Sequence, residues 1–73
     1  MTDKQRLAAL NAMDKAVIFA KDIAPIVHTH ESQIRHMAKT GEWDEEHDGE
    51  FIRVGNRIKF KRADFVMKWS GRV

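Results

Sequence analysis

The stretch that decides the fold is Thr29-His30-Glu31-Ser32-Gln33-Ile34-Arg35-His36-Met37-Ala38-Lys39-Thr40-Gly41. Its first residue, a threonine, is a good helix N-cap, and its last, a glycine, suits the left-handed position that ends a helix. On a helical wheel, Ile34, Met37 and Ala38 fall on one side, and the other side is polar and cationic. The stretch therefore predicts a short amphipathic helix of about three turns with a basic outer face.

The segments on either side place this helix in a larger unit. Ala20 to Val27 predicts a shorter helix, which Pro25 makes irregular because proline removes a hydrogen-bond donor. A three-residue turn, residues 28–30, joins the two helices. Phe51 to Phe60 carries the clearest strand signal, two β-favouring runs divided by Gly55-Asn56. The order helix, turn, helix and hairpin is typical of a winged helix-turn-helix domain.

Two registers are open for the hairpin. A strict two-residue loop pairs Val54 with Arg57 and divides the apolar residues between the two faces. Pairing Val54 with Ile58 instead gathers the apolar side chains on one face and leaves the charges on the other. We expect the second register because it buries more apolar surface. Its tip then presents Asn56 and Arg57 to a phosphate or a minor groove.

The remaining segments complete a small core. Residues 3–13 predict a helix that opens with a capping box at Thr2–Gln5, and its thin apolar edge is expected to pack on its own domain rather than on a second copy. Residues 17–19 either add a third strand to the hairpin or enter the core as extended chain. In a last helix, residues 61–69, Phe65 and Trp69 are expected as core anchors.

These segments predict a mainly α fold with a small β-hairpin wing, a winged helix-turn-helix domain of three to four helices. Residues 1–14 are expected to form an N-terminal helical extension, and residues 15–73 the domain itself.

The net charge of +2 hides a segregation of charge along the chain. Six of the eleven acids lie in residues 42–50, a window without Lys or Arg that predicts a mobile surface loop with Trp43 tucked onto the core. All thirteen basic residues but only five acids lie outside the window, which leaves a local charge of +8. Residues 51–73 alone hold seven bases and one acid. Such a field attracts nucleic-acid phosphate or an anionic surface.

Several classes of function find no support in the sequence. There are no cysteines and hence no disulfides or thiolate metal site, and no apolar run approaches the roughly 18 residues that cross a bilayer. His28, His30 and His36 lack a closing ligand at a usual zinc spacing, and the acidic window lacks the ligand register of a calcium loop. No nucleophile–base pair or phosphate loop is visible. We therefore expect a cytoplasmic protein that is not an enzyme and needs no cofactor.

A family resemblance rests on four segments in order: Ala20–Ile26, Ser32–Gly41, Ile52–Phe60 and Arg62–Trp69. Together they span about two thirds of the chain, and this part resembles the excisionase-type, MerR-like winged helix-turn-helix domains of phages and mobile elements. The resemblance implies a DNA-binding protein of a bacterial host cell, either an excisionase-like recombination accessory factor or a small transcriptional regulator. It places the second helix in the major groove and the wing on the minor groove or backbone, with a recombinase or another phage protein as a further partner.

Position by position, the resemblance implies a set of DNA contacts on the second helix and the wing. Arg35 is the candidate for a guanine, because a guanidinium can bridge O6 and N7, and Thr29 with the helix N-terminus is placed for a phosphate. The full set of candidates is Thr29, Ser32, Gln33, Arg35, His36, Lys39, Arg53, Asn56, Arg57 and Lys59.

A second function stays open. The same fold can serve as a protein-interaction module, for example a small terminase-like packaging or assembly component of a phage. Its contact would be the acidic window or the N-terminal helix, and that helix also leaves self-association open.

Overall fold

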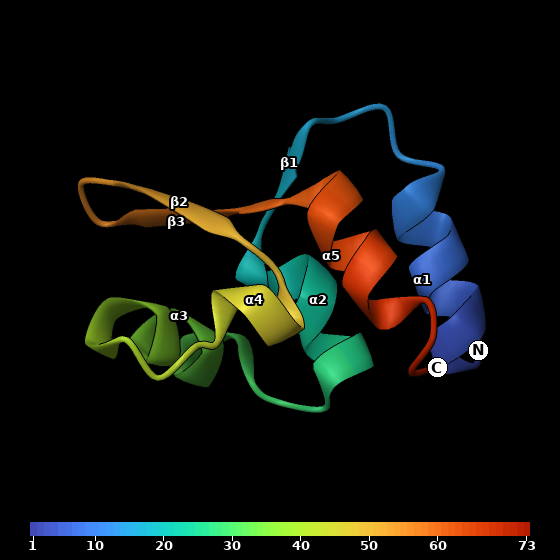
Figure 1. Cartoon of the computed structure of the whole chain (residues 1–73), viewed down its shortest axis with the longest axis horizontal. Coiled ribbons are helices and arrows are strands. Elements are labelled where there is room, and N and C mark those ends of the chain that lie inside the picture. Colours follow the sequence, from blue (N-terminus) through green and yellow to red (C-terminus); the bar gives the residue numbers. More distant parts are fainter.

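A computed structural model describes all 73 residues and has the winged helix-turn-helix arrangement (Figure 1). Five helices surround a three-stranded antiparallel sheet of order β1-β3-β2. In chain order the elements are α1 (Asp3–Asn11), β1 (Val17–Ile18), α2 (Ala20–Val27), α3 (Glu31–Thr40), α4 (Glu45–Asp48), β2 (Phe51–Val54), β3 (Arg57–Lys61) and α5 (Arg62–Trp69). The predicted fold class is confirmed, and the helix beyond the expected four is the single turn α4.

The two ends of the molecule are formed by different elements. The β2–β3 hairpin, which is the wing, lies beside α3 at one end, while α1 packs against α5 at the other (Figure 1). Leu7 and Leu10 of α1 are buried in the same core as the rest of the chain, so the expected packing of α1 on its own domain is confirmed.

The core centres on Phe60 of β3. This side chain is completely buried, with Trp43 edge-on at 5.1 Å and Phe51 at 5.8 Å between ring centroids. Phe65 of α5 is equally buried and stacks on Trp69 at 5.5 Å. The predicted core roles of Trp43 and Phe65 are thus confirmed, and Trp69 is half-buried and packs against this core.

Most helix ends follow the sequence signals. The Thr2 hydroxyl accepts from the Gln5 N–H at 3.1 Å and the Gln5 side chain accepts from the Thr2 N–H at 2.8 Å, which is the predicted capping box. Gly41 ends α3 with φ +82°, as predicted.

The predicted start of α3 at Thr29 is wrong by one residue. The N-cap is His30, whose ring Nδ1 accepts from the Ser32 N–H at 3.2 Å. The Thr29 hydroxyl donates to the Val27 carbonyl instead, at 3.2 Å. His28 takes a left-handed conformation, φ +54°, to turn the chain between the helices.

The predicted register of the hairpin is also wrong. Val54 pairs with Arg57, so the loop has the strict two residues. Gly55 has φ +60° and Asn56 has no positive φ, the pattern of a type II′ turn, whose twist matches that of the strands. The register puts Phe51 and Phe60 on the inner face, and leaves Ile52 and Val54 on the outer face, 43% and 59% exposed.

Two further segments are settled by contacts that only the fold creates. Val17 pairs with Lys61 and Ile18 with Phe60, so residues 17–18 form the third strand. The acidic window, expected as a mobile surface loop, contains the one-turn helix α4, which Asp44 caps and to which two indole N–H groups are bonded. Trp43 donates to the Gly49 carbonyl at 2.8 Å, and Trp69 donates to the Asp48 carbonyl at 2.9 Å.

Candidate nucleic-acid interface

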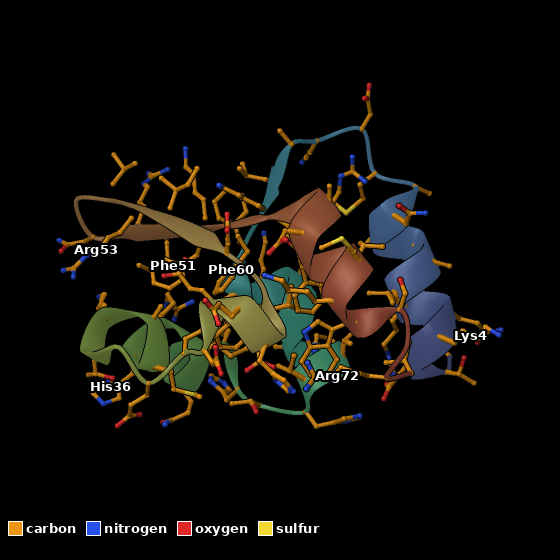
Figure 2. All side chains as sticks on the ribbon, in the orientation of Figure 1. Lys4, His36, Phe51, Arg53, Phe60 and Arg72 are labelled. Atoms are coloured by element: carbon orange, nitrogen blue, oxygen red, sulfur yellow. The ribbon has the colours of Figure 1, made fainter.

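The outer face of α3 is polar and free of packing. Ile34 and Ala38 are buried and fix the rotation of the helix, which turns Ser32, His36 and Lys39 outward. Figure 2 shows His36 pointing away from the body of the protein. Gln33 is exposed on one flank of this face. This face is therefore open to a partner, and it carries four of the predicted DNA contacts, Ser32, Gln33, His36 and Lys39.

Arg35 lies on the other flank of α3, the one that faces the wing. Its side chain is 42% exposed, and its Nη1 lies 3.7 Å from Glu31 Oε1, one turn earlier on the helix. At this distance the ion pair is loose, so the guanidinium is available to another anion.

A pocket of about 230 Å³ separates this flank of α3 from the wing. Three elements line it: α3 provides Arg35, the start of α2 provides one wall, and the hairpin provides another. The lining residues are Phe19, Ala20, Arg35, Asn56, Arg57 and Ile58. The structure thus brings together three of the predicted DNA contacts, Arg35, Asn56 and Arg57, from two elements that are distant in sequence.

The wing carries the other predicted cations. Arg53 pairs with Ile58 on the inner face, and Figure 2 shows it near the free end of the hairpin on the side where α3 lies. Its Nε donates to the Gly55 carbonyl at 3.3 Å. Lys59 and Arg57 stand on the outer face, opposite Ile52 and Val54. Basic side chains therefore occupy both faces of the wing.

The start of α3 is less open than the sequence indicated. The hydroxyl of Thr29 is bound to the Val27 carbonyl, and the His30 ring covers the first turn through Ser32, with Nδ1 2.8 Å from Oγ. Of the predicted set, Thr29 and the N-terminus of α3 are therefore the least accessible to a phosphate.

Ion pairing divides the cations into two groups. Lys39, Arg53, Arg57 and Lys59, all on α3 or the wing, have no carboxylate within ion-pair distance. From the end of β3 onward three basic residues are paired, Lys61 with Glu50 at 2.8 Å, Lys68 with Asp64 at 2.9 Å and Arg72 with Asp48 at 2.9 Å, whereas Arg62 donates to the carbonyls of Lys15 and Asn11. The acids near α4 are therefore partly neutralised by α5 and the C-terminus, whereas the cations of α3 and the wing are not.

Two pKa values reflect this paired region. The pKa of Lys61 is raised because its ammonium donates to the Glu50 carboxylate and feels its charge. The pKa of Asp64 is lowered because its carboxylate accepts from the Glu50 N–H at 2.8 Å and pairs with Lys68.

The histidines take separate roles. His28 bonds through Nε2 to Asp3 at 2.7 Å, and this hydrogen bond, with help from Arg6, lowers the pKa of the Asp3 carboxyl. His30 caps α3 and His36 is exposed. No group of three or more His, Asp or Glu side chains is arranged to hold a metal ion, and no helix is long and apolar enough to span a membrane.

Sequence reasoning missed the pocket wall formed by Phe19, Ala20 and Ile58. The sequence placed Phe19 and Ile58 in β-favouring runs and Ala20 at the start of a helix, and no local pattern signals that the start of α2 and the open edge of β3 lie next to Arg35. Only the pairing of β1 with β3 brings them together.

Comparisons with protein-family models, with curated proteins and with solved structures found no match. The resemblance to excisionase-type domains therefore stays a prediction that rests on the residues themselves.

Proposed function

We propose that this protein binds double-stranded DNA, with α3 in the major groove and the wing on the adjacent minor groove or backbone. In this role it acts as an excisionase-like recombination accessory factor or as a small transcriptional regulator. Fold alone does not carry the proposal, because one fold hosts many functions.

The observation that carries it is the group of four unpaired cations, Lys39, Arg53, Arg57 and Lys59, on the two elements that a winged helix presents to a duplex. Cations without internal partners are free to neutralise phosphates and to release the counterions condensed on them.

The first test is fluorescence anisotropy with a labelled duplex of about 20 to 30 base pairs, two to three helical turns, at low and near-physiological salt. The double variant Lys39→Ala/Arg57→Ala removes two cations from the interface. Lys4→Ala/Lys15→Ala removes the same charge elsewhere, and Figure 2 shows Lys4 at the opposite end of the molecule. We expect salt-sensitive binding by the wild type and by the control, and loss of binding in the interface variant.

Two results would refute DNA binding at this surface. One is the absence of salt-sensitive binding by the wild type even at low salt. The other is an equal loss of affinity in both double variants, which would show that net charge alone drives the association.

A protein-interaction module is the second candidate, favoured by the acids Glu42, Asp44, Glu45 and Glu46, which make no ion pair. The N-terminal helix is a weaker contact for such a module because its Leu7 and Leu10 are already buried. A stable complex with a basic protein partner, lost on replacing these acids by their amides, would favour this function over DNA binding.

A further inference from the structure

The pocket between α3 and the wing lies where a duplex must place its backbone. If α3 enters a major groove and the wing tip enters the adjacent minor groove, the strand that separates the two grooves passes between them. On this protein the space between them is the pocket lined by Arg35, Arg57 and the start of α2. From this geometry we infer that the pocket is a phosphodiester-binding site in which Arg35 and Arg57 hold one DNA phosphate from two sides.

The walls of the pocket supply hydrogen-bond donors. One wall is the N-terminus of α2, at Phe19 and Ala20, where the first N–H groups of a helix have no intrahelical acceptor and the helix dipole is positive. The Phe19 N–H is bonded to Asp22 at 2.9 Å, so the donors are those of the next residues. The apolar surface of Phe19, Ala20 and Ile58 suits the sugar that adjoins a phosphate.

The opposite wall is a strand edge left open by the short β1. This strand pairs only with Phe60 and Lys61, so β3 has no neighbour on that side from Arg57 to Lys59. The Lys61 N–H donates to Glu50 on the β2 side, and the alternation of an antiparallel ladder then turns the Ile58 N–H to the open side. Arg57 pairs with Val54 next to this edge and lines the pocket, and its side chain has no ion-pair partner.

This inference rests on the proposed DNA-binding function and changes the role of Arg35 within it. The family resemblance made Arg35 the candidate for a guanine, but its place on the flank of α3, beside the pocket, sets it nearer the backbone than the bases. Ser32, His36 and Lys39, on the outermost face, are left as the candidates for base edges. Two acids compete with the phosphate on this side: Glu31, the loose partner of Arg35, and Asp22, whose carboxylate accepts the Phe19 N–H at the start of α2.

The test has a DNA arm. We expect Arg35→Ala to weaken binding about equally on two duplexes of unrelated sequence, and to reduce the slope of log affinity against log salt by about 1, as for one lost phosphate contact. Lys4→Ala, which removes the same charge at the far end, should leave both quantities unchanged. Arg35→Lys should recover part of the affinity, because it restores the charge without the two-pronged geometry.

A second arm uses inorganic phosphate and needs no DNA. In ¹⁵N–¹H NMR spectra of the wild-type protein, added phosphate should shift the amide signals of Ala20, Lys21 and Ile58 in a saturable way, and the Arg35→Ala/Arg57→Ala variant should lose these shifts. Signals outside the pocket report whether the variant keeps its fold.

The two arms separate the two proposals. If Arg35→Ala weakens binding to one duplex much more than to the other and leaves the salt slope unchanged, Arg35 contacts a base. This result would overturn the phosphate site and leave DNA binding intact. Phosphate shifts in the pocket without any binding of DNA would leave an oxyanion site and refute the proposed function. Phosphate shifts that persist in the double variant would also overturn the site.

Discussion

Gly49 occupies a position that no other residue can fill without strain. Its φ of +126° with ψ of 140° lies in a region open essentially to glycine alone, and an added Cβ would lie 3.3 Å from the Phe65 Cα. Its carbonyl also accepts the Trp43 indole N–H. The residue therefore fixes the path of the chain from α4 into the wing.

We expect Gly49→Ala to lower the free energy of unfolding by about 1 to 3 kcal/mol, from the backbone strain alone. Gly71→Ala is the matched control, because Gly71 has no positive φ and nothing lies within 4 Å of its Cβ position. Its effect should stay within about 0.5 kcal/mol. Urea denaturation followed by tryptophan fluorescence measures both changes, and an equal effect of the two substitutions would contradict the strain at Gly49.

At the scale of single residues, the sequence predicted helix caps well, but it predicted less well which of two neighbouring residues forms a cap. The capping box at Thr2 and the left-handed Gly41 depend only on residues within one turn, so the pattern is sufficient. The N-cap of α3 moved from Thr29 to His30 because an imidazole Nδ1 can accept the same N–H as a hydroxyl, and the left-handed His28 sets which residue is in position.

The hairpin shows how a turn can outweigh a count of apolar residues. The predicted register placed four apolar side chains on one face of the hairpin. However, α2, α3 and Trp43 cover only a limited area of the inner face, and three apolar side chains fill it. Ile58, Phe60 and Phe51 fill that space, and Gly55 closes a two-residue turn of favoured twist. As a result Ile52 and Val54 stay exposed, and the pattern of apolar residues along the strands does not predict this exposure.

The double variant Ile52→Thr/Val54→Thr tests this register. Threonine keeps the β propensity, so two exposed positions should change the free energy of unfolding by no more than about 1 kcal/mol in total. Ile58→Thr makes the same kind of change at a buried position and should cost about 2 kcal/mol or more. A double variant as destabilised as Ile58→Thr would show that Ile52 and Val54 are buried, as the other register requires.

Asp64 joins two elements that the sequence left unconnected. Its carboxylate accepts the N–H of Glu50, just before β2, while its ion-pair partner Lys68 donates to the Glu45 carbonyl at the start of α4. The acidic segment is thus fastened to α5 by polar contacts over 14 and 23 positions of chain, and local composition, which suggested a mobile loop, carries no trace of them.

This contact predicts a dependence of stability on pH. Because the folded pKa of Asp64 is lowered from 3.8, its contribution is fully present above about pH 4 and is lost as the pH falls through the folded pKa. We expect Asp64→Asn to reduce the loss of stability between about pH 4 and pH 2, measured by urea denaturation at a series of pH values. Asp14→Asn, at an exposed residue without an ion pair, should lose stability over this pH range as the wild type does. The same loss in the wild type and in both variants would contradict the role of Asp64.

Over the whole molecule, charge is arranged by fold rather than by sequence order. The protein measures 30 × 23 × 20 Å, several times the Debye length of about 8 Å at physiological salt, so mainly neighbouring charges interact there. The carboxylates of Glu50, Asp64 and Asp48 form ion pairs with Lys61, Lys68 and Arg72, so these charges are neutralised within the protein. The unpaired acids of residues 42–46 remain as a negative field, which in the proposed binding mode would oppose the approach of DNA to the wing.

Removing that field should strengthen DNA binding in a salt-dependent way. In the triple variant Glu42→Gln/Asp44→Asn/Glu46→Gln, asparagine keeps the N-cap of α4 and the net charge rises by three. At about 0.01 M salt the Debye length of about 30 Å spans the molecule, so we expect a several-fold gain in affinity in the anisotropy assay. At about 0.15 M salt the Debye length falls to about 8 Å, and the gain should largely disappear because the acids act through the field rather than through contact. A gain that persists at the higher salt would mean that the acidic segment touches the duplex, and no gain at either salt would remove the acids from the DNA-binding electrostatics and favour their use as a protein contact.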